Sequence, residues 1–448
     1  MVVAFPLQIP DNCEFGIHNI PFGIFSTQTT SASDQTGPRA GSAVGDYVLD
    51  LDVLEKGGIF QGLELTTAIA GTFSQVLNPP TLNRFAAFPA RERSLVRNAI
   101  INALKSKDSA LFTDPEINRK AFIRRAEVQM HLPLQTGHYT DSFCSLIHAQ
   151  NALAPLGLPL VPAWYDFPMA YYGRNGGLAV SGADVVRPRG IYPSSEGERA
   201  SLQASRKLDF EIELAFFISA PLRPGQIVTA KEAAEHIFGF VLLNDWSARD
   251  IQKHEMAPLG VFHSKSFQTS ISPWIITLDA LKGSRANPPA SNSTEIESLL
   301  ICDTADHGLF DLDFSAKVSR NGGADVVIAQ SNLKHAYWSP YQMLAYHSLS
   351  GSGIDTGDLL GTGTHSNPES QTSISAGQTP PTRCGCLVEV FGLGETLPEV
   401  EGKPMGWLED GDRLTIDAWF RTFEGEKAGF GPLTGLILPA VEGSKSWP

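Results

Sequence analysis

The stretch LDFEIELAFFIS, residues 208–219, changes along its length from an alternating pattern to an apolar one. In its first half Asp209, Glu211 and Glu213 alternate with apolar residues, as the period of two in a β-strand requires. In its second half the apolar residues follow one another, as in a strand buried on both faces. We therefore expect one long strand whose three carboxylates share a face with little access to solvent.

Carboxylates in such a position are costly unless a cation or a proton compensates them. Glu211 and Glu213 would lie about 7 Å apart on the strand, a span that one divalent cation can bridge. Asp245 adds an acidic group directly after the apolar run at residues 238–244. This pattern predicts a site for Mg²⁺ or Ca²⁺, which prefer oxygen ligands. The alternative interpretation is an ordinary solvated strand face.

Three more polar residues fit such a site. Asp141 and, seven residues later, His148 lie in GHYTDSFCSLIHAQN, residues 137–151. A neutral imidazole near a divalent metal can take a proton from water close to neutral pH. Lys265 can supply positive charge to a developing oxyanion. Taken alone, His148 would be a structural histidine and Lys265 a surface lysine.

The rest of the chain consists mainly of short runs of β-forming residues separated by Gly, Pro and Asn, which predicts a mainly β protein of the α+β class. We expect further strands at residues 22–25, 47–54, 238–245, 300–302, 309–314, 324–331, 386–392 and 412–420. Apolar spacing predicts helices at residues 94–106, at 229–240 with Thr229 as N-cap, and at 339–350. Residues 282–295 and 363–383 are rich in turn formers and are expected to be exposed loops.

Composition limits the partners of the chain. The 448 residues include 34 Lys and Arg and 48 Asp and Glu. The resulting net charge of −14 disfavours binding to nucleic acid and to anionic membranes. The five cysteines form no C-x-x-C pair, which favours a reducing cytosol over a disulfide framework or a zinc knuckle. Neither a signal peptide nor an apolar run of about 18 residues is found. We expect a cytoplasmic protein with a small-molecule substrate.

Motifs of other enzyme classes are incomplete. His254 and Glu255 begin an H-E-x-x-H pattern, but Pro258 stands where the second histidine would be. The sequence contains no G-x-S-x-G nucleophile elbow and no phosphate-binding G-x-x-x-x-G-K-[ST] loop. Its glycine clusters also lack the G-x-G-x-x-G spacing of nicotinamide cofactor sites.

Several motifs closely resemble the fumarylacetoacetase family: KLDFEIELAFF (207–217), NDWSARDIQ (244–252), KSFQTSISPW (265–274), YYGRNGGLAVSG (171–182), IHNIPFGIFST (17–27) and AGFGPLTGLILPA (428–440). The resemblance covers nearly the whole chain. It implies an SH3-like β-barrel in residues 1–133, a catalytic mixed β-roll in residues 134–448, and a homodimer. It also implies hydrolysis of a carbon–carbon bond in a 1,3-dicarbonyl substrate, as in tyrosine and phenylalanine catabolism.

The positions of the family's motifs imply specific roles. The Mg²⁺ or Ca²⁺ ligands would be Asp141, Glu211, Glu213 and Asp245. His148 would be the base that activates water, and Glu389 would orient it and stabilise its charged form. The resemblance implies that a leaving carbanion or an oxyanion is stabilised by Arg249, Gln252 and Lys265, and that the substrate contacts Tyr171 and Thr364. A β-diketone that chelates the metal through two oxygens fits these roles, because the metal stabilises the expelled enolate.

Three departures from the family concern the substrate. Two tyrosines of the family are replaced by Phe143 and Met256, and no Lys or Arg lies between His148 and Arg174, where the family has an arginine that contacts substrate. Each lost charge-assisted hydrogen bond should cost about 1.5–3 kcal/mol. We expect a substrate whose distal end is less polar than the fumaryl carboxylate. The alternative is that other residues compensate for the lost groups.

Two other functions remain open at this point. A metal-stabilised enolate also serves a decarboxylase, a tautomerase or a bond-forming biosynthetic enzyme, and oxygen-18 from water would enter the product only in hydrolysis. A catalytically silent binding protein is the second alternative. It is disfavoured because a silent scaffold has no use for buried charges that are costly to retain.

Overall fold

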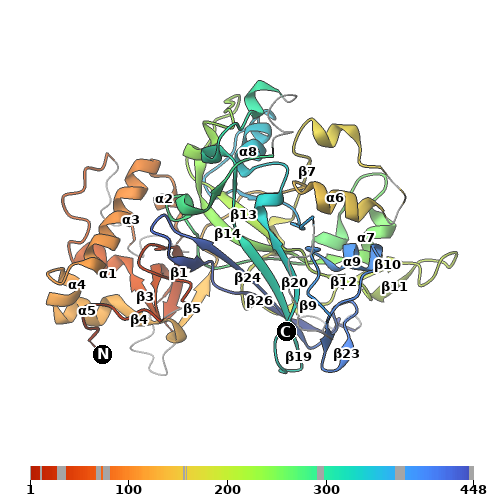
Figure 1. Cartoon of the computed structure of the whole chain (residues 1–448), viewed down its shortest axis with the longest axis horizontal. Coiled ribbons are helices and arrows are strands. Elements are labelled where there is room, and N and C mark those ends of the chain that lie inside the picture. Colours follow the sequence, from red (N-terminus) through yellow and green to blue (C-terminus); the bar gives the residue numbers. More distant parts are fainter. Residues whose placement is uncertain are drawn as a thin grey trace.

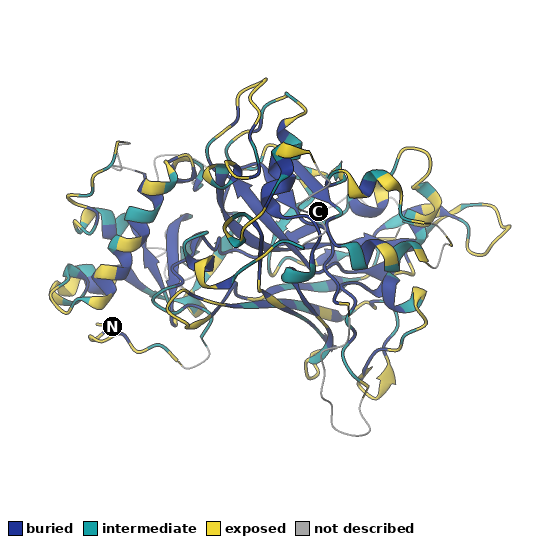
Figure 2. Cartoon of the chain, turned by 45° about the horizontal axis from the view of Figure 1, so that its top comes forward, coloured by how far each residue is buried: buried dark blue, intermediate teal, exposed yellow. Residues whose placement is uncertain are grey.

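The structure is a computed structural model, and it describes residues 2–10, 13–27, 37–66, 72–73, 81–154, 157, 159–289, 297–368 and 379–442. The chain has a mixed α and β architecture, in which one sheet lies with several helices at the N-terminal end of the molecule and two larger sheets lie beside it (Figure 1). Buried residues concentrate in the central strands, and exposed residues lie in the peripheral loops and on the outer helix faces (Figure 2).

The N-terminal part contains an antiparallel sheet with the strand order β4-β3-β2-β1-β5. Its strands are β1 (Phe22–Thr27), β2 (Arg39–Val44), β3 (Tyr47–Asp50), β4 (Phe122–Arg124) and β5 (Val128–His131). The accompanying helices are α1 (Leu51–Lys56), α2 (Asn83–Ala86), α3 (Ala90–Lys105), α4 (Ala110–Thr113) and α5 (Pro115–Ala121). Among the described residues the pairings follow an open path from β4 to β5, so the SH3-like barrel is not established by this sheet.

The central sheet has seven strands in the order β7-β6-β21-β13-β14-β16-β8. They are β6 (Tyr139–Ser142), β7 (Ala170–Tyr172), β8 (Leu178–Val180), β13 (Glu213–Ile218), β14 (Ile237–Asp245), β16 (Thr269–Ile271) and β21 (Leu359–Gly361). Strand β6 is parallel to β21 and β16 is parallel to β8, whereas the other neighbours are antiparallel. The sheet is therefore of mixed direction.

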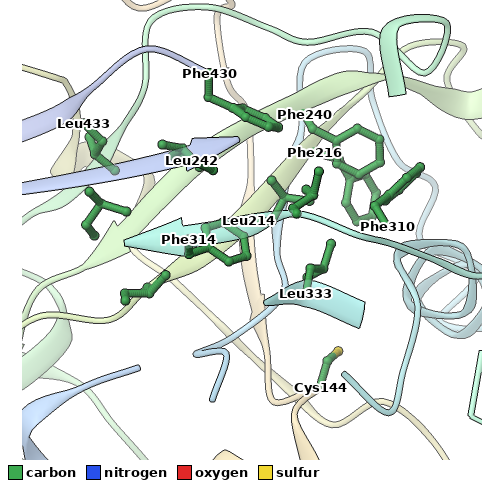
Figure 3. Close-up of a cluster of buried hydrophobic side chains, with 14 of the residues drawn as sticks. Cys144, Leu214, Phe216, Phe240, Leu242, Phe310, Phe314, Leu333, Phe430 and Leu433 are labelled. Atoms are coloured by element: carbon green, nitrogen blue, oxygen red, sulfur yellow. The ribbon is translucent and has the colours of Figure 1, made fainter. Parts of the chain in front are cut away.

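Strands β13 and β14 are buried on both faces, as their apolar runs predict. On one face Leu214 and Phe216 pack with the C-terminal core (Figure 3). On the opposite face Phe217 and Val241 pack with apolar residues of the N-terminal part. The central sheet therefore forms the layer that both halves of the chain share.

The C-terminal sheet has the order β20-β19-β24-β26-β9, with β25 paired to β24. Its strands are β9 (Val185–Val186), β19 (Asp313–Arg320), β20 (Val326–Asn332), β24 (Asp412–Arg421), β25 (Lys427–Gly429) and β26 (Leu433–Leu438). Phe314 and Leu433 from this sheet belong to the same core cluster as Leu214 and Leu242 of the central sheet (Figure 3). The largest apolar core thus lies between these two sheets.

The remaining elements are short. The helices are α6 (Leu146–Leu153), α7 (Arg249–Glu255), α8 (Pro340–Ser348) and α9 (Leu387–Gly392). The two-stranded pairs are β10 (Arg189–Tyr192) with β11 (Ser201–Ala204), β12 (Leu208–Asp209) with β15 (Ser247–Ala248), β17 (Arg285–Ala286) with β18 (Leu309–Phe310), and β22 (Glu399–Val400) with β23 (Lys403–Pro404). Helices α6, α7 and α9 lie on the side of the molecule away from the N-terminal part (Figure 1). No helix of the described residues is long and apolar enough to cross a membrane.

The helices predicted at residues 94–106 and 339–350 are confirmed as α3 and α8. The prediction of a helix that begins at Thr229 is wrong, because only a short 3-10 helix, Ala233–His236, precedes β14. The strand expected at 47–54 ends at Asp50, whose carboxylate accepts hydrogen bonds from the first turn of α1. The strand expected at 300–302 is also wrong, since a 3-10 helix, Ser298–Leu300, occupies its start.

Two corrections concern the region around residues 208–219. The single long strand is interrupted between β12 and β13, so Asp209 and Glu213 lie on different strands. The strand expected at residues 386–392 is instead helix α9. Its first two N–H groups, of Leu387 and Val388, donate to the Asp209 carboxylate at 2.7 and 3.0 Å, a cap supplied from a distant part of the chain.

The prediction of exposed loops at residues 282–295 and 363–383 is wrong in part. Residues 363–367 are buried, while residues 369–378 lie outside the described residues. In the other loop Arg285 and Ala286 form β17, and residues 290–296 lie outside the described residues.

Candidate functional site

Four buried carboxylates gather where strands of the central sheet begin or end. Asp141 lies on β6, Glu213 begins β13, and Asp245 ends β14, while Glu211 lies in the segment between β12 and β13. Asp141, Glu211 and Asp245 each offer an oxygen within 4.8 Å of the others. Glu213 is outside this set of three, but it lies close enough for Asp141 to raise its pKa, an effect second to that of burial.

Gly361 on β21 makes room for two of these groups. Strand β21 lies between β6 and β13, and Gly361 pairs with Asp141 on one side and with Ala215 on the other. A Cβ atom on Gly361 would lie 2.6 Å from Asp141 Oδ1 and 3.3 Å from Glu213 Oε2. The two carboxylates therefore approach each other across a position without a side chain. Sequence reasoning missed this glycine, although a glycine within a strand is a signal of close approach.

Two cations balance part of the negative charge. Lys265 Nζ lies 2.8 Å from Asp245 Oδ2 and also contacts Glu211. Arg249 bonds to Glu211 Oε1 and to Asp209 Oδ2, each at 2.8 Å. Burial raises the pKa of Glu211, but Lys265 and Arg249 outweigh it and hold that pKa below its usual range. Arg249, expected to stabilise an oxyanion, therefore also serves as the counter-ion of two carboxylates.

The other carboxylates are less well compensated. Burial and the neighbouring Asp245 raise the pKa of Asp141 to about 8. Asp141 Oδ1 and Glu213 Oε1 are buried without a hydrogen-bond partner in the described part of the chain. Burial disfavours the ionised form of these carboxyl groups, and a hard divalent cation would supply the positive charge that stabilises it.

A buried histidine and glutamate form a pair beside this cluster. His148 Nδ1 lies 2.7 Å from Glu389 Oε1, which joins helix α6 to helix α9. Glu389 also accepts hydrogen bonds from Asn151 Nδ2 at 2.8 Å and from Ser366 Oγ at 2.8 Å. Burial raises the pKa of Glu389, but His148 and hydrogen bonds from Asn151 and Cys386 outweigh that effect and lower it. Sequence reasoning missed Asn151 and Ser366, whose role depends on contacts between distant segments.

A cavity of about 900 Å³ brings most of the expected site residues together. It is lined by Asp141, Phe143, His148, Tyr171, Glu211, Glu213, Arg249, Gln252, Met256, Lys265 and Thr364. Asp245 and Glu389 are fully buried behind this lining. The Tyr171 hydroxyl donates to Asp245 at 2.5 Å, and the Gln252 carbonyl accepts from Arg249 at 3.0 Å.

Apolar side chains form a further part of the cavity lining, called here the apolar wall. The ring of Phe143 meets the ring of His148 edge-on at 5.2 Å. The apolar wall also includes six side chains that sequence reasoning did not assign to the site: Leu153, Met169, Val261, Val388, Phe391 and Trp407. Lys207 and Lys253 also line the cavity and are exposed to solvent. A bound molecule would therefore meet both charged groups and hydrocarbon.

Two protein families match the chain. The family described as Fumarylacetoacetase N-terminal matches residues 18–133. The family described as Fumarylacetoacetate (FAA) hydrolase C-terminal matches residues 139–437.

Individual relatives match over nearly their full length. The chain is 35% identical to a fumarylacetoacetase of Arabidopsis thaliana, over 97% of this chain and 98% of that protein. It is 34% identical to a fumarylacetoacetase of Homo sapiens, over 97% and 99%. Among solved structures, a maleylpyruvate hydrolase from Sphingobium is similar in fold, with a TM-score of 0.50, 16% identity and coverage of 94% of this chain and 100% of that one.

Proposed function

The chain belongs to the fumarylacetoacetase family, and from this premise we propose that it is a hydrolase that cleaves a carbon–carbon bond of a ketonic substrate, fumarylacetoacetate or a close analogue. Hydrolysis of fumarylacetoacetate yields fumarate and acetoacetate. The observation that carries the proposal is that His148, paired with Glu389, lines the same cavity as Asp141, Glu211 and Glu213.

Asp141, Glu211, Glu213 and Asp245 would hold a divalent cation, Mg²⁺ or Ca²⁺. When bound, such a cation polarises a substrate carbonyl and stabilises negative charge on its oxygen. The carboxylates contribute the oxygen ligands, and Lys265 and Arg249 keep Glu211 ionised for this purpose.

The proposed reaction uses His148 as a general base. Because Nδ1 is bonded to Glu389, Nε2 is the nitrogen that takes a proton from water. The resulting hydroxide attacks the ketone carbon of the fumaryl group, and the bond from this carbon to the adjacent methylene carbon breaks. The electron pair of that bond becomes the enolate of acetoacetate, which then takes up a proton. Glu389 stabilises the imidazolium during these steps, as a carboxylate does for a catalytic histidine.

Three polar groups would stabilise the negative charge. Lys265 is the cation best placed for the enolate or the oxyanion, since its ammonium lies at Asp245 and Glu211 on the cavity wall. Arg249 and Gln252 lie together on α7, where the guanidinium donates to the amide carbonyl. Tyr171 and Thr364, which both line the cavity, would contact the substrate.

Replacement of His148 tests the role of the base. We expect His148→Ala to lower kcat for fumarylacetoacetate by about 10²–10⁴, the usual contribution of a positioned base. Glu389→Gln should also lower kcat, because it removes the charge that stabilises the imidazolium. A suitable control is His131→Ala, since His131 lies on β5 in the N-terminal sheet. Near-normal turnover by His148→Ala would contradict the assignment.

Isotope labelling separates hydrolysis from other enolate chemistry. Hydrolysis in water labelled with oxygen-18 places one labelled oxygen in the new carboxylate. A decarboxylase, tautomerase or bond-forming enzyme would not incorporate that oxygen by cleavage. Products without label would favour these alternatives.

The apolar wall supports a substrate that is less polar at its distal end than fumarylacetoacetate. Phe143 and Met256 line the cavity and offer no hydroxyl to a carboxylate. We expect a 1,3-diketo acid with an alkyl or aryl distal group to have a kcat/KM at least about tenfold above that of fumarylacetoacetate, which corresponds to one lost hydrogen bond of about 1.4 kcal/mol. The double variant Phe143→Tyr, Met256→Tyr should shift the preference toward fumarylacetoacetate. The opposite ranking of substrates would mean that Lys207 and Lys253 hold the distal carboxylate.

The family also suggests properties of the whole assembly. We propose a homodimer, an SH3-like barrel in residues 1–133 and a catalytic unit in residues 134–448. A reducing compartment such as the cytoplasm is supported by the five cysteines, all of which are free. Light scattering of the purified chain would measure the oligomeric state, and a monomer at micromolar concentration would contradict the dimer.

A further inference from the structure

A second cluster of metal-ligating atoms lies behind the catalytic histidine. Cys386 Sγ is 3.2 Å from Glu389 Oε1 and 3.9 Å from His148 Nδ1. The third separation, between His148 Nδ1 and Glu389 Oε1, is 2.7 Å. All three side chains are buried, and their ligand atoms lie within 4.8 Å of one another. The proposed reaction uses His148 and Glu389, but it gives Cys386 no part.

These separations are near those of a tetrahedral zinc site. Zinc bond lengths of about 2.0–2.3 Å place neighbouring ligand atoms roughly 3.3–3.5 Å apart. The observed separations of 2.7, 3.2 and 3.9 Å lie on both sides of that range, so modest side-chain movements would open the site. Oε1 of Glu389 faces Cys386 and His148 and also accepts a hydrogen bond from Ser366 Oγ at 2.8 Å, whereas Asn151 donates to Oε2.

The ligand types distinguish this cluster from the carboxylates in the cavity. Asp141, Glu211 and Asp245 offer only oxygen, the ligand that Mg²⁺ and Ca²⁺ prefer. Cys386, His148 and Glu389 offer sulfur, nitrogen and oxygen, a combination typical of Zn²⁺. One active site therefore contains two sets of ligands with different metal preferences.

We propose that His148, Cys386 and Glu389 form an inhibitory Zn²⁺ site, in which zinc reversibly removes the general base from the reaction. The inhibitory effect rests on the proposed function, whereas the binding itself does not. On binding, the Cys386 thiol loses its proton to solvent and its sulfur bonds to zinc. The proton on His148 Nδ1 moves to Nε2, because Nδ1 now bonds to the metal. A protonated Nε2 is unable to accept a proton from water, so hydrolysis stops.

The position of the cluster determines how zinc reaches it. Among the described residues, His148 lines the cavity, whereas Cys386 and Glu389 are fully buried behind it. Zinc must therefore pass the imidazole ring to reach the thiol. We expect inhibition to develop slowly after zinc is added and to reverse slowly when a chelator removes it.

Cobalt binding tests the site without any enzyme assay. Co²⁺ replaces Zn²⁺ at thiolate sites and gives a thiolate-to-cobalt charge-transfer absorption. We expect this band when the full-length protein, already saturated with Mg²⁺, is titrated with Co²⁺. Cys386→Ser should lose the band. Cys384→Ser is the matched control, since Cys384 is also buried and lies two residues away, with its sulfur 4.0 Å from Glu395 instead of beside His148. Loss of the band in Cys384→Ser, or its persistence in Cys386→Ser, would overturn the site.

Zinc inhibition of hydrolysis tests the effect on activity. At saturating Mg²⁺, we expect the zinc concentration for half inhibition to rise at least about tenfold in Cys386→Ser and to stay unchanged in Cys384→Ser, because one of three ligands is lost. The serine hydroxyl can still donate to Glu389, so hydrolysis without zinc should continue. Equal sensitivity of both variants would overturn the inhibitory role. A cobalt band in a protein without hydrolytic activity would support the site and refute the proposed function.

Discussion

His365 shows how burial fixes the charge of a single side chain. Its Nε2 and the Thr362 hydroxyl are 2.7 Å apart, and its ring stacks on Phe314 with a centroid separation of 6.0 Å. Burial, with a smaller contribution from His148, lowers the pKa of His365 from 6.5 to about 3. The folded protein therefore keeps this imidazole neutral at pH values where the unfolded chain would protonate it.

This pKa shift predicts a loss of stability in mild acid. Between pH 6.5 and about 3 the unfolded chain binds a proton at His365 that the folded protein does not bind. The neutral His365 therefore stabilises the folded protein fully above pH 6.5. Below pH 6.5 the free energy of unfolding decreases by up to about 1.4 kcal/mol per pH unit because of this residue. We expect His365→Asn, which can still bond to Thr362, to flatten this dependence. Urea unfolding of both proteins between pH 5 and 7 measures it, and identical slopes would contradict the prediction.

At the scale of elements, strand β21 decides how closely two carboxylates approach. It separates β6 from β13, so Asp141 and Glu213 would be kept apart by any side chain at the intervening position. Gly361 occupies that position and leaves the space open. The metal site proposed above therefore depends on a strand that contributes no ligand.

Gly361→Ala tests this dependence. Because the added Cβ would lie 2.6 Å from Asp141 Oδ1, the carboxylate must move. We expect the affinity for Mg²⁺ or Ca²⁺, measured by calorimetry, to fall at least about tenfold, as changes around metal ligands commonly cause. Gly406→Ala is the control, since its Cβ would meet nothing within 4 Å. Unchanged metal binding in a folded Gly361→Ala protein would argue against a site that includes Asp141.

Helix α9 illustrates a different dependence between elements. The residues 386–392 are apolar and β-branched enough to predict a strand, yet they form a helix. Asp209 accepts the first N–H groups of this helix and pairs with Arg249 at 2.8 Å. The helix in turn positions Glu389 against His148. A short apolar run is ambiguous by itself, and here a distant carboxylate favours the helix.

At the scale of the whole molecule, the N-terminal part completes the core of the central sheet. Phe22 and Phe85 pack with Phe238, with ring centroids 6.5 and 5.9 Å from it. Backbone hydrogen bonds of 3.0 and 2.8 Å also join Phe22 and Ile275 in both directions. The two halves of the chain therefore share one apolar core, although they match two different protein families.

This arrangement predicts that residues 134–448 are not stable alone. Removal of residues 1–133 would expose a continuous apolar face that includes Phe217, Phe238 and Val241. We expect the shortened chain to aggregate or to melt well below the full-length protein, which should unfold in a single transition. Calorimetry and light scattering of both chains measure this. A soluble shortened chain with the melting temperature of the full-length protein would show that the core is not shared.

The sequence by itself determined the buried strands β13 and β14, the helices α3 and α8, and the residues to examine for metal binding and base catalysis. Periodicity and motif resemblance are properties of neighbouring residues, so they can be read without coordinates. The roles of His148, Glu389 and the carboxylates remain predictions for the experiments above. What the sequence missed are the break between β12 and β13, the open position at Gly361, the apolar wall of the cavity and the position of Cys386.

Only the tertiary structure decided these features, because each depends on residues that are far apart in the chain. His148 and Glu389 are 241 positions apart, and Asp209 reaches a helix 178 positions away. Their contacts come from the packing of sheets and helices around one cavity, which no local pattern encodes. The physical reason is that side-chain spacing along a strand is set by backbone geometry, whereas the meeting of distant side chains is set by which apolar faces bury each other.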